Sequence, residues 1–149
     1  MCIRDRFSHL VTSERLQFVK EWRECSARFC ELLGDCGKKK NKDKIDYYYY
    51  KMIFMCNPTK PEAYIDKELV GLLEQIYILY QELNNNTCEE KDKKKQQLKL
   101  MQKRFVALMQ ANIAIEWHGI TAESRKGHLS DEHKEDLRQE HYKDYLESV

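Results

Sequence analysis

The chain has 149 residues and 18.0 kDa, enough for one domain, and its 26 basic and 25 acidic residues give a formal charge of +1. A charge so close to zero excludes the strong overall field that draws a protein to nucleic acid or to an anionic membrane, so partners must be recognised by local patches. Five glycines and two prolines are too few for the turns of an all-β sandwich or barrel, which makes a helical protein the first prediction.

Residues 1–6 resemble a translated sequencing adapter that occurs at the start of many assembled sequences, and we expect them to be non-native. A non-native start leaves two alternatives open: the native N-terminus lies close to residue 7, or it lies further upstream and the chain is a fragment. We expect residues 7–149 to form a single helical domain. Its first helix is predicted from Leu16 to Leu33, where apolar residues recur at intervals of three and four, and Gly34 and Gly37 end it.

The second predicted helix follows Asp43 and carries four consecutive tyrosines, Tyr47–Tyr50. Residues Tyr47 to Met55 are apolar nearly all round, so a buried strand is the alternative, but Met, Lys and the lack of hairpin turns favour a helix. Four adjacent tyrosines cannot all enter one core, and at least one hydroxyl must find water or a partner. We interpret the quartet as a wide packing face, or alternatively as a ligand groove in which Lys51 presents its ammonium to an anion.

Three further helices are predicted beyond the break at Asn57-Pro58. A capping box at Thr59–Glu62 predicts that the third helix begins there, and Asn84 to Asn86 end it. A second capping box, Thr87–Glu90, predicts a fourth helix from Cys88 to His118-Gly119, and Ser130 is a predicted N-cap for the fifth. The chain is therefore predicted to be an all-α, antiparallel helical bundle or array of about five helices.

Cysteine and histidine spacings argue against metal or catalytic chemistry. Without Cys2 the five remaining cysteines match neither a zinc site nor a disulfide scaffold, so we expect thiols in a reducing, cytoplasmic setting. No apolar stretch is long enough to span a membrane. Neither HExxH nor a Glu-x-x-His pair occurs, and His133 and His141 are eight residues apart. We predict no metal site, no cofactor and no catalytic residue, and hence a protein that is not an enzyme.

Two lysine-rich segments form a basic patch if the loop before the second helix and the start of the fourth lie at the same end of the bundle. Acidic residues are interleaved with these lysines and aromatic residues are missing from both runs, which favours a solvated face over a nucleic-acid site. The candidate residues of this basic patch are Lys38, Lys39, Lys40, Lys93, Lys94 and Lys95.

Four segments are similar, in the same order, to parts of the helical 14-3-3 phosphopeptide-binding proteins. They are Lys20-Glu21-Trp22-Arg23, Tyr48-Tyr49-Tyr50-Lys51-Met52, Asn112 near the end of a long helix, and Leu137-Arg138-Gln139-Glu140-His141-Tyr142-Lys143-Asp144. The resemblance implies that Lys51 faces a phosphate and that Asn112 holds the backbone of a bound peptide. The family's arginine-tyrosine pair would fall at Pro58 and Thr59, so the main phosphate clamp is not matched.

These observations together predict a non-enzymatic adaptor that binds a peptide, phosphopeptide or partner helix in a helical groove. The alternative is a helical nucleic-acid or phosphate-binding protein that uses the lysine-rich segments, and a histidine-based metal protein comes third. The candidate residues of the peptide groove are Lys51, Asn112, Tyr48, Leu72, Ile76, Leu108 and Ile115.

Overall fold

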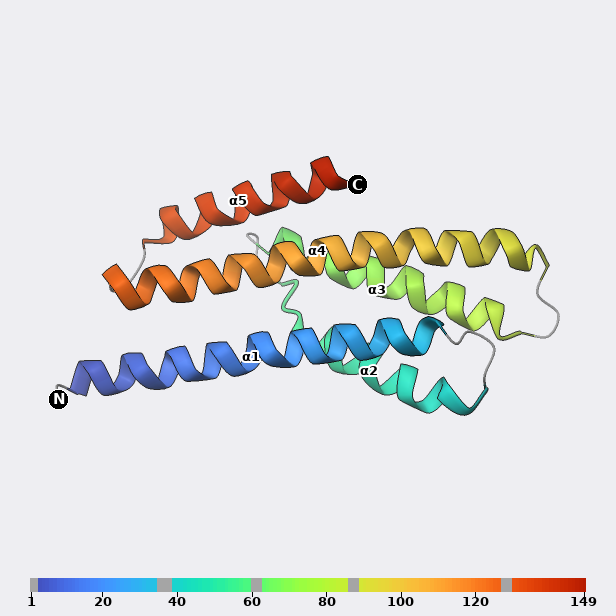
Figure 1. Ribbon diagram of the computed structural model, residues 1–149, viewed down its shortest axis with the longest axis horizontal. Helices are drawn as coiled ribbons and strands as arrows, with labels where there is room; N and C mark the ends of the chain where they lie inside the picture. The colour runs from blue at the N-terminus through green and yellow to red at the C-terminus, as the bar shows by residue number, and fades with distance from the viewer. Residues whose placement is uncertain (1–2, 35–38, 60–62, 86–88, 127–129) are drawn as a thin grey trace. The chain divides into compact units, whose positions relative to one another are not determined.

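The computed structural model describes the backbone of residues 3–34, 39–59, 63–85, 89–126 and 130–149, and the side chains of residues 13–34, 40–59, 63–85, 89–123 and 130–149. Within these ranges all regular structure is helical, which confirms the all-α prediction of about five helices (Figure 1). The elements are α1 (Ile3–Gly34), the short 3-10 helix η1 (Lys39–Asn41), α2 (Lys42–Met55), α3 (Tyr64–Leu83), α4 (Lys91–Lys126) and α5 (Asp131–Ser148).

The chain divides into two compact units. Unit 1 comprises Met1–Glu24 and Gln110–Val149, and unit 2 comprises Cys25–Met109. Helices α1 and α4 therefore each contribute one part to each unit. None of the described helices is both long enough and apolar enough to cross a membrane.

Unit 2 is built from four successive helical segments that alternate in direction: the last part of α1, then α2, α3 and the first part of α4 (Figure 1). The apolar stripe predicted for α3 fills much of its core, because Leu69, Leu73 and Ile76 are completely buried. Phe29 of α1 and Phe105 of α4 meet edge to face, with ring centroids 6.1 Å apart. Burial of these side chains supplies most of the driving force for this unit.

Unit 1 contains the first part of α1, the last part of α4, and α5. Arg15 of α1 binds the carboxylates of Glu116 and Glu123, both on α4, and Lys134 of α5 lies 3.6 Å from Glu123. Gly119 makes room for this arrangement, since a Cβ added there would lie only 3.0 Å from the Arg15 guanidinium. A chain of charges thus links the three helical segments of unit 1.

Several predicted helix ends are correct and others are wrong. Tyr47–Met55 is helical, as favoured, and Ser130 caps α5 as predicted, its hydroxyl accepting a hydrogen bond from the His133 N–H at 3.2 Å. The first helix begins at Ile3 rather than Leu16, and α4 continues to Lys126, beyond His118-Gly119.

Neither capping box begins a helix where it was predicted. The Thr59 hydroxyl donates to the Asn57 side chain, and α3 starts only at Tyr64, after Ala63, which makes no side-chain cap bond. The fourth helix is predicted to begin at Cys88, a residue that lies outside the described ones, but α4 begins at Lys91. Glu90 directly before it has a φ of 54°, a left-handed conformation that cannot continue into a right-handed helix.

Candidate functional site

The most exposed aromatic surface of unit 2 lies on α2. Its residues recur at intervals of three and four, which places them on one side of the helix. We call the set of Lys44, Tyr47, Tyr50, Lys51 and Phe54 the α2 outer face. Phe54 is 84% exposed, Tyr47 is 58% exposed and Tyr50 is 51% exposed. Large aromatic side chains gathered on one exposed face are typical of an interaction surface.

The opposite side of α2 is fixed to the rest of unit 2. Ile45 and Met52 are buried in the core, and the Tyr49 ring stacks on Tyr77 of α3 with centroids 4.1 Å apart and planes 4° from parallel. The Tyr77 hydroxyl donates a hydrogen bond of 2.6 Å to Asp46. Burial, followed by this bond to the carboxylate, raises the pKa of Tyr77 well above its ordinary value, so the hydroxyl stays a donor. The outer face is therefore presented by an anchored helix.

Positive charge accompanies the aromatic rings of the α2 outer face. The Lys51 ammonium lies 5.8 Å from the centroid of the Tyr47 ring, within reach of a cation–π interaction. Lys44 is exposed one turn before Tyr47, and Asp43, also exposed, is the acid at the N-terminal edge of this side of the helix. The face thus combines apolar area with a local excess of lysine.

The residues proposed for a peptide groove are divided between the two units, and all of them are buried or half-buried. Leu72, Ile76 and Leu108 lie in the core of unit 2, so a partner could reach them only if the helices opened. Tyr48 and Lys51 are half-buried on α2. The two remaining candidates, Asn112 and Ile115, are half-buried residues of unit 1. Of the whole set, Lys51 alone belongs to the α2 outer face.

One lysine from each lysine-rich segment lies at one end of unit 2, near the end of α3. Lys42, at the start of α2, shares a pocket with the end of α3, and Lys94, at the start of α4, lies 3.3 Å from Glu82 near that same end. Lys93 is 3.8 Å from Glu90, whereas Lys95 is exposed. Two of the three candidate lysines of α4 therefore lie beside acids, which weakens their attraction for phosphate.

Of the three candidate lysines before α2, the structure describes the side chain of one. Lys38 lies outside the described residues, and of Lys39 only the backbone is described. Lys40 is exposed in η1.

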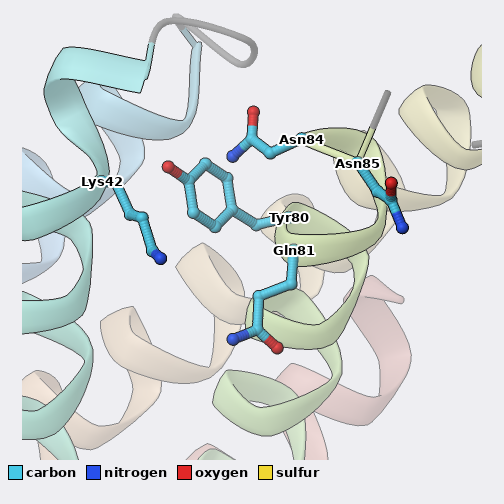
Figure 2. A pocket seen from close by; sticks show the side chains of 5 residues that line it. All are labelled: Lys42, Tyr80, Gln81, Asn84 and Asn85. Carbon is cyan, nitrogen blue, oxygen red and sulfur yellow. The ribbon is translucent and has the colours of Figure 1, made fainter. Parts of the chain in front are cut away.

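A pocket of about 400 Å³ opens at this lysine-rich end, between α2 and α3. Figure 2 shows the Lys42 side chain reaching from α2 towards Tyr80, while Asn85 points away. Gln81 and Asn84 complete the lining, and the side-chain oxygen of Asn84 is buried without a hydrogen-bond partner among the described residues. The lining offers one ammonium and several amides, but no second cation to hold a doubly charged phosphate.

Two histidines that the sequence analysis did not associate meet in unit 1. His118 of α4 and His141 of α5 approach to 2.8 Å between Nδ1 and Nε2, with ring centroids 4.8 Å apart. His133, which was considered beside His141, is exposed near the start of α5, and His128 lies outside the described residues. Spacing along one helix gives no signal for the observed pair, because its members come from two helices.

The described cysteines do not form a reactive centre. Cys25, Cys30 and Cys56 are thiols rather than disulfides, while Cys36 and Cys88 lie outside the described residues. Burial, together with the nearby Asp66 carboxylate, raises the pKa of Cys56 to about 12, and burial also raises the pKa of Cys30. Since the thiolate is the nucleophile, neither thiol is activated at neutral pH.

Comparison with protein-family models finds no match for the chain, and comparisons with curated proteins and with solved structures find none either.

Proposed function

We propose that the protein is a non-enzymatic interaction module whose α2 outer face binds an acidic, amphipathic partner helix. The observation that carries this proposal is the grouping of Tyr47, Tyr50 and Phe54, all more than half exposed, on one side of an anchored helix. Aromatic side chains are enriched at protein interfaces because each buries a large apolar area at a small entropic cost. This surface takes the place of the groove expected from the sequence and retains Lys51 from it.

Charge selects the partner's chemistry. Lys44 and Lys51 lie among the aromatic residues, Lys42 is exposed at the start of the same helix, and Lys40 is exposed in η1 just before it. A partner with apolar residues along one stripe and Asp or Glu beside it would satisfy both the rings and the ammonium groups. From Lys44 to Phe54 the face is about 15 Å long, which suits an amphipathic helix laid along α2.

A protein partner accounts for this face better than nucleic acid does. Binding to a nucleic-acid backbone requires several lysines or arginines whose charge is not neutralised by nearby acids. Lys93 and Lys94 do not meet this requirement, because they lie beside Glu90 and Glu82. Among the described residues Phe54 is the most exposed large apolar side chain, and it has no polar atom to place in water, so burying it under a partner is favourable. The thiols at Cys25, Cys30 and Cys56 support a reducing, cytoplasmic setting for this interaction.

The test uses synthetic fluorescein-labelled amphipathic peptides of about 18 residues, or roughly five helical turns, read by fluorescence anisotropy. One peptide carries acidic polar residues, a second has the same apolar stripe with basic residues, and a third adds a phosphoserine to the acidic one. We expect the acidic peptide to bind, the basic one not to, and Phe54→Ala to weaken binding by about tenfold or more, as for a central interface residue. Lys51→Glu should weaken it as well.

Leu100→Ala is the matched control, because Leu100 is a half-exposed apolar residue of α4 outside the α2 outer face. It should leave the affinity unchanged, and all variants should keep the helical circular dichroism of the wild type. Equal binding by Phe54→Ala and wild type would overturn the proposal. Tighter binding of single-stranded oligothymidylate, with an affinity that collapses as salt rises, would instead favour the nucleic-acid function. A requirement for the phosphoserine would favour the 14-3-3-like one.

A further inference from the structure

We propose that His118 and His141 form a binding site for a divalent transition-metal ion, which joins α4 to α5 within unit 1. The two imidazoles come from different helices and bring Nδ1 and Nε2 to 2.8 Å from each other. This site is independent of the proposed function, because the α2 outer face belongs to unit 2.

The spacing of the two nitrogens is the first argument. A metal–imidazole bond measures about 2.0–2.1 Å, so two imidazoles bound at a right angle place their nitrogens roughly 2.9 Å apart. The observed 2.8 Å is close to that value. In the structure the two nitrogens face each other. To bind one ion, both rings must rotate until the lone pairs of the two nitrogens converge on a common point beside the line between the nitrogens. His118 is exposed and His141 is half-buried at the surface, which leaves room for this rotation.

Metal binding by both facing nitrogens requires a change of tautomer. In the observed pair one of the facing nitrogens donates its hydrogen to the other, so one lone pair is already available. Binding requires the remaining hydrogen to move to the far nitrogen of its own ring, a change of tautomer that needs no net loss of a proton from a neutral pair. A ring in either tautomer is an ordinary ligand for such metals.

The donor set decides the class of ion. Imidazole nitrogen suits Ni²⁺, Cu²⁺ and Zn²⁺, whereas Mg²⁺ and Ca²⁺ require oxygen ligands. Among the described side chains no group of three His, Cys, Asp or Glu surrounds a common point, so water must complete the coordination. A right-angled pair of nitrogens completed by water matches the octahedral or square-planar preference of Ni²⁺ and Cu²⁺ better than the tetrahedral preference of Zn²⁺.

An ion pair also joins the same two helices. Lys134 of α5 lies 3.6 Å from Glu123 of α4, and Tyr145, one turn after His141, is buried. An ion bound by both histidines would replace their direct hydrogen bond with two metal–nitrogen bonds between α4 and α5, and its binding free energy would stabilise the docking of α5.

The experiment measures Ni²⁺ binding by the full chain with isothermal titration calorimetry, and the thermal midpoint of unfolding with and without Ni²⁺. Ni²⁺ is chosen because it does not oxidise thiols. We expect one site in the wild type that is lost or weakened on the order of tenfold or more in His141→Gln and in His118→Gln, since the second imidazole binds intramolecularly. Ni²⁺ should raise the midpoint of the wild type and leave that of either variant unchanged, and Mg²⁺ should have no effect.

His133→Gln is the matched control, because His133 is an exposed histidine of the same helix outside the pair. It should bind Ni²⁺ and respond in thermal midpoint like the wild type. The proposal is overturned if the wild type binds no Ni²⁺, if His141→Gln and wild type bind equally, or if His133→Gln loses as much affinity as His141→Gln. Circular dichroism of each apo variant establishes that the helices remain formed, so that lost binding reports on the ligands.

Discussion

Two phenylalanines give the sharpest test of the described core, because the same substitution is expected to destabilise the protein strongly at one of them and hardly at all at the other. Phe29 is completely buried and packs against Phe105, while Phe54 is 84% exposed on α2. Truncating a fully buried Phe to Ala costs about 3–5 kcal/mol in free energy of unfolding, since the cavity does not collapse completely. The same truncation at an exposed site changes that free energy by about 0.5 kcal/mol or less.

Urea denaturation followed by circular dichroism measures both variants. With an m-value of about 2 kcal/mol/M, Phe29→Ala should lower the midpoint by roughly 1.5–2.5 M, and Phe54→Ala should leave it within about 0.3 M of the wild type. Phe29→Leu, which keeps most of the volume, should fall between them at a cost of about 1–2 kcal/mol. Equal midpoints for the two alanine variants would refute the assignment of Phe29 to the core and of Phe54 to the surface.

Three further expectations concern polar groups. Ser130→Ala removes the cap of α5 and should cost about 1 kcal/mol, seen as a lower thermal midpoint that Ser130→Asp restores. Tyr77→Phe removes the hydrogen bond to Asp46 and should cost about 1–2 kcal/mol, with tyrosine absorbance at high pH showing one fewer late-ionising group. Cys56 should react with iodoacetamide at pH 8.5 far more slowly in the folded than in the unfolded chain. Because its pKa is about 12 when folded and 9.0 ordinarily, this thiol's contribution to stability is complete below about pH 9 and is lost as the pH rises towards 12.

The helical class and the core of α3 could be predicted from the sequence, because an amphipathic stripe directly reports which side of a helix is buried. The α2 segment was ambiguous for a physical reason. Its outer face carries Tyr47, Tyr50 and Phe54 in addition to the buried Ile45 and Met52, so apolar residues surround the helix and the periodicity is blurred. The feature that obscured the secondary structure is the one that now carries the proposed function.

Other features depend on side-chain contacts that neither capping motifs nor apolar periodicity reveal. The capping box predicts the start of α3 too early because the Thr59 hydroxyl bonds to Asn57 instead of capping a helix, while the Asn57 N–H donates at 2.8 Å to Asp66 in the first turn of α3. Likewise His118 and His141 are 23 positions apart in sequence, and only the packing of α5 on α4 brings them together.

The sparse burial of α5 has a consequence for dynamics. Tyr145 is the one buried side chain among its described residues, although the helix is 18 residues long. An element with so little apolar contact detaches at a small free-energy cost, independently of global unfolding. Its backbone amides should therefore exchange with deuterium well before those of α3, and a protease that requires extended substrate should cut within α5 first.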